Sequence, residues 1–345
     1  MKRLAVNLVL LVLALNMVAS YEKASDEKVF EKFQNFMQQH DKSYKTIEEF
    51  KDRFEIFKQN YKKIEMHQMM LHKDGKEPTY ELGVTQFFDL TPSEFSKLYL
   101  TLDISHMQRL KSQAEAVKPS YSEGEAPSTW DWRDQGKVSP VRNQGMCGSC
   151  WAFSAIGNIE SVYAKKTGQI LQFSEQQLVD CDTVDHGCGG GLMEDAYKYL
   201  ETSGVMTEEN YSYTGQKGAC KFDQSKALAK VTGFKYASSQ DENVIKQFLY
   251  ENGPLAIAIN ATPLQFYFFG IFNPWFEWIC NPKELNHGVL LVGYGISGNT
   301  PYWIVKNSWG QGWGEKGFFR IIAGKGACGI NTYVITAEVE TVSDI

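Results

Sequence analysis

Residues 144–151 read Gln-Gly-Met-Cys-Gly-Ser-Cys-Trp, and an apolar helical pattern begins where they end. Apolar side chains recur along one face at Ala152, Ile156, Ile159 and Tyr163. Gly168 is a suitable C-terminal stop, so the sequence predicts a helix that starts near Ser149 or Cys150. Unpaired backbone N–H groups and the helix dipole stabilise a thiolate at such a start, which makes Cys150 a candidate nucleophile.

Cys147 and Cys150 also have the spacing of half a zinc site or of a redox pair. A zinc site needs a second close pair of cysteines or histidines. Cys181 and Cys188 are separated by six residues, which fits that requirement poorly. The sequence therefore predicts neither a metal ion nor a cofactor.

The N-terminus has the pattern of a secretory signal peptide. Lys2 and Arg3 form a positive head, residues 4–18 are almost wholly apolar, and residues 18–20 read Val-Ala-Ser, a small-residue cleavage pattern. The alternative is a membrane anchor, but an apolar run of about fifteen residues is shorter than the roughly 20 that a bilayer needs. No later stretch is long and apolar enough to cross a membrane. We therefore expect a soluble mature protein that has passed through an oxidising lumen.

Seven cysteines lie between residues 147 and 328 of the 345-residue chain. An odd number in a secretory protein indicates disulfides and one remaining thiol, and three bridges are the simplest allocation. The count alone does not identify the free cysteine.

The composition is that of a folded and mildly acidic protein. Apolar residues make up 43% of the chain, charged residues 22%, and the net charge is −6. These values allow real cores and argue against wholesale disorder. Because Lys and Arg form no long run, a nucleic-acid partner has no electrostatic support.

The chain changes character twice along its length. From about residue 26 to residue 70 it lacks proline and glycine, and aromatic side chains at helical spacing predict two amphipathic helices. Residues 103–128 have the composition of a linker, a natural site of proteolytic cleavage. Beyond residue 129, short apolar runs predict strands. These runs are Leu255–Ile259, Gly288–Val292, Tyr302–Lys306 and Gly317–Ile321.

A thiolate nucleophile needs a base and a group that orients the base. Four of the six histidines precede residue 129, which leaves His186 and His287. His186 has no nearby orienting amide, whereas His287 stands at the entry of a predicted strand and Asn307 follows another. A Cys-Gly-Ser-Cys-Trp segment with His and Asn far downstream is a pattern of cysteine nucleophiles, although a lone histidine is more commonly structural.

Three motifs occur together in one order along the chain: Gln144 with Cys150-Trp151, Asn286-His287-Gly288, and Asn307-Ser308-Trp309-Gly310. On these motifs the sequence resembles the papain family of cysteine proteases, and within it the cathepsin F/L-like group. The resemblance runs from about residue 26 to residue 337. It implies an α+β, papain-like two-domain fold with a helical left domain and an antiparallel β-barrel right domain, preceded by a mainly helical inhibitory propeptide.

The resemblance divides the chain into three segments. These are a signal peptide over residues 1–20, an inhibitory propeptide over residues 21–125, and a mature peptidase domain over residues 126–345. Maturation is expected close to Ala126-Pro127, within the linker.

The resemblance also implies a role for each matched residue. Cys150 attacks the peptide carbonyl and forms a thioester, while His287 pairs with the thiolate and then protonates the leaving amine. Asn307 orients the imidazole, and Trp309 shields that hydrogen bond from water. Gln144 donates a side-chain N–H to the developing oxyanion, with the Cys150 backbone N–H as the second donor.

Substrate binding is implied for two further groups of residues. The run Gly189, Gly190 and Gly191 lacks side chains, so an extended peptide could pair with its backbone; a flexible loop beside a disulfide would look the same. Alignment to the family assigns the pocket for the residue two before the cleaved bond to Leu192, Met193, Ala258, Leu285 and Tyr333. These residues predict a preference for bulky apolar side chains rather than Arg.

The family pattern pairs Cys147 with Cys188, Cys181 with Cys220, and Cys280 with Cys328. Cys150 then remains free. Two Asn-x-Ser/Thr sequons, at Asn210 and Asn260, are candidate glycosylation sites.

The first third resembles the inhibitory propeptide of these proteases. Its interspersed helix motif is Glu49, Arg53, Phe57, Asn60, Ile64 and Gln68, with Gln68 where many members have Asn. A second motif contains Gly83, Phe87 and Asp89, but Thr85 replaces its usual Asn. The propeptide is expected to thread the cleft against the direction of substrate. Asp89 and other carboxylates suggest release on acidification.

The implied partners are polypeptide substrates, the chain's own propeptide and cystatin-like inhibitors, with the enzyme a monomer in a lysosome or vacuole or outside the cell. A catalytically silent relative with a binding role is one alternative, but such relatives usually lose the nucleophile or the base. An exopeptidase of the same fold would need a long insertion with paired histidines, which is not seen after residue 168. An endopeptidase is therefore favoured.

Overall fold

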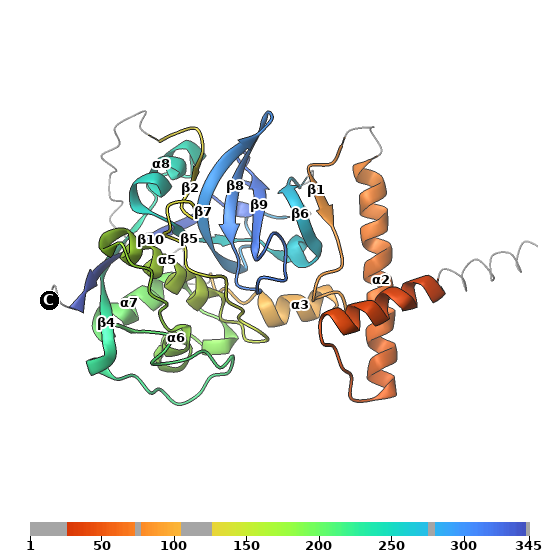
Figure 1. Cartoon of the computed structure of the whole chain (residues 1–345), viewed down its shortest axis with the longest axis horizontal. Coiled ribbons are helices and arrows are strands. Elements are labelled where there is room, and N and C mark those ends of the chain that lie inside the picture. The colour runs from red at the N-terminus through yellow and green to blue at the C-terminus, as the bar shows by residue number, and fades with distance from the viewer. Residues whose placement is uncertain (1–25, 73–76, 105–125, 275–279, 343–345) are drawn as a thin grey trace, which may run out of the picture. The chain divides into compact units, whose positions relative to one another are not determined.

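The computed structural model describes residues 26–72, 77–104, 126–274 and 280–342 (Figure 1). The predicted signal peptide and most of the predicted linker lie outside these residues. The chain forms two compact units: Met1–Glu77 with Gln86–Thr91, and Pro78–Thr85 with Pro92–Ile345. Each unit is built differently.

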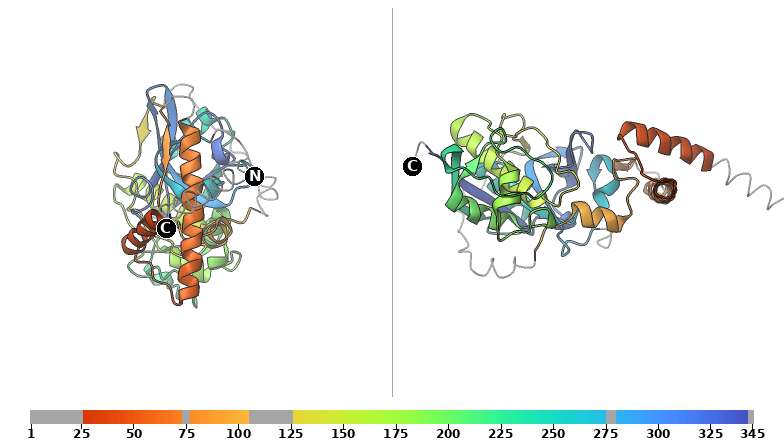
Figure 2. Two further views of the ribbon diagram at one scale, coloured as in Figure 1. Left: turned by 90° about the vertical axis from the view of Figure 1, so that its right-hand side faces the viewer. Right: turned by 90° about the horizontal axis from the view of Figure 1, so that it is seen from below.

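The first unit consists mainly of two helices, as the aromatic spacing predicted. Residues 26–39 form one helix, which crosses the second, α2 (Ile47–Leu71) (Figure 2). The side chain of Thr46 caps α2 by accepting a hydrogen bond from the Glu49 N–H at 3.1 Å. The two helices pack through aromatic rings, with Phe33 and Phe57 fully buried and their centroids 5.2 Å apart.

Polar contacts hold residues 86–91 against α2 in the same unit. Asn60 is buried in α2 and donates both side-chain hydrogens, to the carbonyls of Phe88 at 3.0 Å and Leu90 at 2.9 Å. Asp89 forms an ion pair with Lys42 at 2.9 Å and accepts a hydrogen bond from the hydroxyl of Tyr44 at 3.0 Å. These contacts supply partners for buried backbone carbonyls that no helix or sheet satisfies.

The second unit contains helices and one large sheet. Its α-helices are α3 (Pro92–Tyr99), α5 (Cys150–Thr167), α6 (Glu175–Cys181), α7 (Met193–Ser203) and α8 (Glu242–Asn252). The start and end predicted for α5 are confirmed. It ends at Gly168, whose backbone is left-handed at φ 81° and whose N–H bonds to the Ala164 carbonyl.

The strands of this unit are short and mostly antiparallel. They are β1 (Tyr80–Leu82), β2 (Trp130–Asp131), β3 (Val205–Met206), β4 (Ala227–Tyr236), β5 (Leu255–Ile259), β6 (Tyr267–Phe272), β7 (His287–Ser297), β8 (Thr300–Lys306), β9 (Phe318–Ile322) and β10 (Tyr333–Thr341). Their order is β1-β6-β9-β8-β7-β5-β10-β4-β3, and β2 pairs with β7. Among the described strand pairs, only β6 and β9 run parallel. All four predicted strands are present, and the α+β class is confirmed.

Helix α5 is almost completely buried because it packs on several sides at once. It contacts α6 and α7 on one side and β7, β5 and β10 on the other (Figure 1). Gly157 lets the helix approach β7 closely, since a Cβ there would lie 3.3 Å from a methyl group of Leu290. The Ser154 hydroxyl donates to the Val289 carbonyl at 2.7 Å and ties the first turns of α5 to β7.

Asn158 in α5 joins the helix to two other parts of the fold. Its Nδ2 donates to the Pro254 carbonyl at 2.7 Å and to the Thr336 hydroxyl at 3.0 Å. Its Oδ1 accepts from the Tyr197 hydroxyl and the Ala337 N–H, both at 2.8 Å. All four bonds are buried, so each partner would be left unsatisfied without this amide.

We therefore expect Asn158→Ala to lower the free energy of unfolding by about 3 kcal/mol, measured by urea denaturation of the full chain. Gln169→Ala is the matched control because it removes an exposed amide, and we expect it to change stability by less than about 0.5 kcal/mol. An equal effect of the two substitutions would contradict this account.

Candidate active site

Cys150 is the first residue of α5 and is a free, buried thiol. Ser149 precedes it at the N-cap position and makes no side-chain cap to the helix. The first backbone N–H groups of α5 therefore lack the usual side-chain acceptor. This is the position that favours negative charge on the sulfur, as expected from the sequence.

His287 begins β7, and its imidazole is oriented by Asn307. Nε2 lies 2.8 Å from the Asn307 side-chain oxygen, which also accepts the Ser308 N–H at 2.8 Å. Because that oxygen can only accept, Nε2 carries a proton, and Nδ1 is the basic nitrogen of the neutral ring. The Trp309 ring covers the imidazole, with centroids 4.8 Å apart.

The fold brings the start of α5 and the start of β7 together. A Cβ added to Gly288, the neighbour of His287, would lie 3.2 Å from the carbonyl oxygen of Cys150. Residues separated by more than 130 positions in the sequence thus adjoin at one corner. The alternative base, His186, is exposed in the loop before the glycine run.

Gln144 lies beside the same corner and is fully buried. Its Oε1 accepts the Ser308 hydroxyl at 2.6 Å, and its Nε2 donates to the Cys147 carbonyl at 3.0 Å. The Gln144 N–H also donates to the Ser308 carbonyl at 2.8 Å. The amide is therefore fixed in orientation, and Nε2 retains a second hydrogen that faces no described acceptor.

Residues 99–103 lie across the place where α5 and β7 begin. They contact both the segment that precedes α5 and the segment that precedes β7. The Thr101 hydroxyl donates to the Gly148 carbonyl at 2.8 Å. Leu102 donates its N–H to the Asn286 carbonyl and forms a parallel bridge with Gly191, whose carbonyl accepts the Asp103 N–H at 3.1 Å. Only a glycine fits at position 190, because a Cβ there would lie 2.1 Å from the Thr101 carbonyl.

The residues assigned to the apolar pocket gather in one buried cluster. All of them are at most 4% exposed, and Leu102 belongs to the same cluster. The cluster members from the sequence assignment are Leu192, Met193, Ala258, Leu285 and Tyr333. Leu102 therefore belongs to the same buried cluster as the side chains that the sequence assigned to substrate.

Burial favours the neutral forms of both the Cys150 thiol and the His287 imidazole. Burial raises the pKa of the Cys150 thiol, although the backbone of Gly288 and both backbone and hydroxyl of Thr101 act in the opposite direction. Burial also lowers the pKa of His287 to about 4, although its hydrogen bond to Asn307 and the backbone of Tyr99 act in the opposite direction. The thiolate–imidazolium pair is thus disfavoured while residues 99–103 are in place.

The three disulfides are Cys147–Cys188, Cys181–Cys220 and Cys280–Cys328. These are the pairs that the family resemblance implied, and the first of them ties the segment before α5 to the glycine run. Within the described residues, no three His, Cys, Asp or Glu side chains are grouped so that they could hold a metal ion. In the same part of the chain, no helix is both long enough and apolar enough to cross a bilayer.

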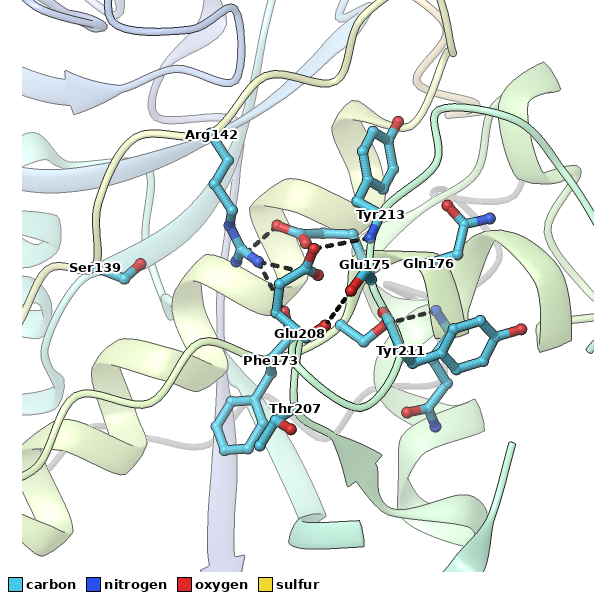
Figure 3. A network of polar contacts seen from close by, with 12 residues as sticks. Ser139, Arg142, Phe173, Glu175, Gln176, Thr207, Glu208, Tyr211 and Tyr213 are labelled. Carbon is cyan, nitrogen blue, oxygen red and sulfur yellow. Dashed lines mark hydrogen bonds and ion pairs between the residues drawn. The ribbon is translucent and has the colours of Figure 1, made fainter. Parts of the chain in front are cut away.

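A largely buried cluster of charges surrounds Arg142, two residues before Gln144 (Figure 3). Arg142 pairs with Glu160 and with Glu175 at 2.7 Å, and lies 3.6 Å from Glu208. Burial is the main cause that raises the pKa of Glu175 to about 8 and lowers that of Lys306 to about 8. A protonated Glu175 leaves two carboxylates opposite two cations, so the buried cluster is close to neutral.

The two candidate glycosylation sites differ. Asn210 is exposed. Asn260 is buried, and its Nδ2 donates to the Asn281 carbonyl at 3.1 Å while its Oδ1 accepts the Thr262 N–H. A glycan on that nitrogen would displace the hydrogen bond to Asn281, so Asn210 is the more accessible of the two candidates.

Sequence reasoning also missed three contributors to the site. Ser308 lies inside a matched motif, so its position next to Asn307 could have drawn attention. Thr101 lies just before the predicted linker, in a stretch to which the sequence assigned no role in the site. Tyr213, whose hydroxyl reaches the carbonyl of Gln144 at 2.8 Å, carries no local pattern that distinguishes it.

Comparison with known proteins shows which proteins this chain resembles in sequence and in fold. A papain family cysteine protease domain matches residues 126–338, and a cathepsin propeptide inhibitor domain (I29) matches residues 33–95. Cysteine proteinase 15A of Pisum sativum is 44% identical over 322 residues, which cover 88% of this chain and 85% of the pea protein. Cathepsin F of Drosophila melanogaster is 41% identical and covers 90% of this chain, which spans 50% of that protein.

A solved structure of the digestive procathepsin L2 proteinase from Tenebrio molitor larval midgut has a TM-score of 0.82 and 36% identity, and covers 90% of this chain and 99% of its own. The fold, the site and these relatives define a papain-like cysteine protease that carries an inhibitory propeptide. The chain belongs to the papain family of cysteine proteases.

Proposed function

We propose that this chain is the zymogen of a secretory cysteine endopeptidase in which Cys150 is the nucleophile. The observation that carries the proposal is a free thiol at the start of α5, adjoining an imidazole that Asn307 holds in one tautomer. Gln144, fixed by Ser308, is the side-chain donor to the oxyanion. The corner has no other buried histidine among the described residues.

The chemistry follows from the assigned protonation states. The Cys150 proton passes to Nδ1 of His287, and the sulfur attacks the peptide carbonyl to form a tetrahedral oxyanion. The free hydrogen on Gln144 Nε2 and the Cys150 backbone N–H stabilise that oxygen. His287 then protonates the leaving amine, and a water molecule that it deprotonates hydrolyses the thioester and regenerates the thiol.

We expect a peptide epoxide to label the acid-processed chain once, on Cys150, as read by mass spectrometry of its peptides. Cys150→Ala should abolish both labelling and peptide hydrolysis, because no other residue at the corner can form the thioester. Gln144→Ala should lower kcat by on the order of 10²–10³-fold while leaving the epoxide adduct on the same cysteine. Peptidase activity that survives Cys150→Ala would refute the assignment.

The propeptide is proposed to inhibit in two ways. Residues 101–103 occupy the backbone positions that a substrate would use, with a parallel bridge at Gly191 that fits threading against the substrate direction. The same residues bury Cys150 and His287, which lowers the population of the reactive ion pair. Occlusion and desolvation thus act together on one pair of side chains.

Release of the propeptide is proposed to follow acidification. The Asp89 carboxylate holds Lys42 and Tyr44, and its main-chain carbonyl accepts from Arg53 at 3.0 Å. Weakening these contacts would loosen residues 86–91 within the first unit. The propeptide fold, and with it inhibition, would therefore weaken as pH falls.

The full chain should mature faster at about pH 5 than at about pH 7.5, since acidification weakens carboxylate ion pairs that hold the propeptide together. Asp89→Asn should accelerate maturation at the higher pH, and Asp52→Asn, which changes an exposed aspartate of α2, should not. Intact mass would read the new N-terminus, expected at Ala126, and glycan occupancy at Asn210. Equal rates for the unmodified chain at both pH values would exclude this trigger.

Substrate preference is proposed to follow the apolar pocket. Its five residues carry no acidic side chain, and Leu102 of the propeptide already packs with them. An Arg side chain there would be desolvated without a partner, which is costly. Bulky apolar residues two positions before the cleaved bond should therefore be preferred.

A library of peptides blocked at both ends should show cleavage after Leu, Val or Phe at that position, with kcat/KM on the order of tenfold or more above Arg. Cleavage of blocked peptides also separates an endopeptidase from an exopeptidase. As a matched variant, Ala258→Glu should raise the relative rate for Arg, because it supplies a carboxylate within the cluster. A wild-type profile dominated by Arg or Lys would overturn the assignment.

The remaining expectations belong to the same proposal. Residues 1–20 would be removed as a signal peptide and residues 21–125 as the propeptide, which leaves residues 126–345 as the mature enzyme. The enzyme would act as a monomer in a lysosome or vacuole or outside the cell, on polypeptide substrates and under control by cystatin-like inhibitors. Its maturation mass and its elution volume on gel filtration test the boundaries and the monomeric state.

A further inference from the structure

Tyr213 lies in the segment after β3 and reaches toward the start of α5. Its ring packs edge-on against Phe153 of α5, with centroids 4.9 Å apart. Its main chain faces the buried charge cluster, and its phenol ring is directed away from that cluster (Figure 3). The Tyr213 side chain is only partly exposed, and its hydroxyl makes hydrogen bonds within the protein.

The hydroxyl of Tyr213 bridges the two ends of the short stretch 144–149, which directly precedes Cys150. It donates to the Gln144 carbonyl at 2.8 Å and lies 2.6 Å from the Ser149 hydroxyl. Because a carbonyl can only accept, the single phenol hydrogen goes to Gln144, and Ser149 must donate to Tyr213. Burial raises the pKa of the Tyr213 phenol, so this hydrogen stays in place throughout the working pH range.

The two ends of this stretch adjoin the two oxyanion donors of the proposed mechanism. Gln144 supplies the side-chain donor, and Ser149 directly precedes Cys150, which supplies the backbone N–H. We propose that Tyr213 is a positioning residue for the oxyanion hole, which sets the distance between its two donors. This inference rests on the proposed function and adds to it a residue that touches neither the substrate nor the reacting atoms.

The backbone of Tyr213 is itself anchored. Its N–H donates to the Glu208 carboxylate at 2.8 Å, and the next N–H, of Thr214, donates to the Gln176 side chain at 2.8 Å. Glu208 belongs to the cluster around Arg142, which is two residues from Gln144. The phenol therefore acts from a rigid support, as a residue that fixes the geometry of another group must.

The expected size of the effect follows from what is lost. Removing an oxyanion donor outright costs on the order of 10²–10³-fold in rate. Tyr213→Phe keeps both donors and the contact with Phe153 but removes the hydrogen-bonded bridge between Gln144 and Ser149. We expect an intermediate loss of about tenfold in kcat with an unchanged KM, because the ground-state substrate does not depend on the donors' spacing.

The test compares Tyr213→Phe with Tyr211→Phe in the mature enzyme. Tyr211 is the matched control because its hydroxyl donates to Asp180 at 2.8 Å and contacts neither Gln144 nor Ser149. Each full-length chain is processed with an unrelated aspartic protease that is then blocked, and active sites are counted with the epoxide. A peptide aldehyde probes the hole directly, since its adduct with Cys150 places an oxygen between the two donors.

We expect Tyr213→Phe to weaken aldehyde binding by about the same factor as kcat, about tenfold, while the rate of alkylation of Cys150 and the Tm stay at the control values. In a Gln144→Ala background the further loss should be much smaller, because one of the two positioned donors is already gone. If Tyr213→Phe fails to fold, Ser149→Ala removes the other end of the link and should weaken aldehyde binding by several-fold.

Wild-type kcat and aldehyde affinity in Tyr213→Phe would overturn the inference. A loss that is fully additive with Gln144→Ala, or a loss accompanied by a raised KM, would do the same. Failure of the proposed function is distinguishable, because the unmodified enzyme would then show no hydrolysis that depends on Cys150.

Discussion

The close packing of α5 against β7 is the constraint on which the rest of the site depends. Gly157 and Gly288 allow the two elements to approach, and Ser154 fixes their register through the Val289 carbonyl. As a result the first residue of a helix adjoins the first residue of a strand. A thiol and an imidazole then share one desolvated corner without any adjustment of the backbone, which is the pre-organisation that nucleophilic catalysis requires.

Where the sequence was informative, the information was local. The helix at Cys150, its end at Gly168 and the strands from residue 255 onward follow from periodicity and from glycine placement, and they are present. The pairing of His287 with Asn307 came only from matched motifs, because no periodicity brings two strand ends together. Tyr213 was beyond reach of either argument, since its significance comes from hydrogen bonds to residues more than sixty positions away.

Burial affects the chemistry of this protein in two opposite ways. Beneath residues 99–103 it holds Cys150 and His287 neutral, whereas in the buried cluster it keeps the total charge near zero by raising the pKa of one glutamate. The first effect is reversible in the proposed maturation, because it depends on residues 99–103, which would be removed. The second is permanent, because Arg142 and its carboxylates belong to the core. Desolvation therefore disfavours the reactive ion pair of Cys150 and His287, and it also limits the charge of the cluster around Arg142.

The disulfides place a limit on how inhibition can be restored. All seven cysteines lie between residues 147 and 328, so only the main chain joins the first 125 residues to the peptidase domain. In the proposed maturation, the uncleaved propeptide is present at a high effective concentration that dilution cannot change. After a single cut it becomes an ordinary ligand whose occupancy falls with enzyme concentration. Activation is thus sharper in dilute surroundings than in a concentrated granule.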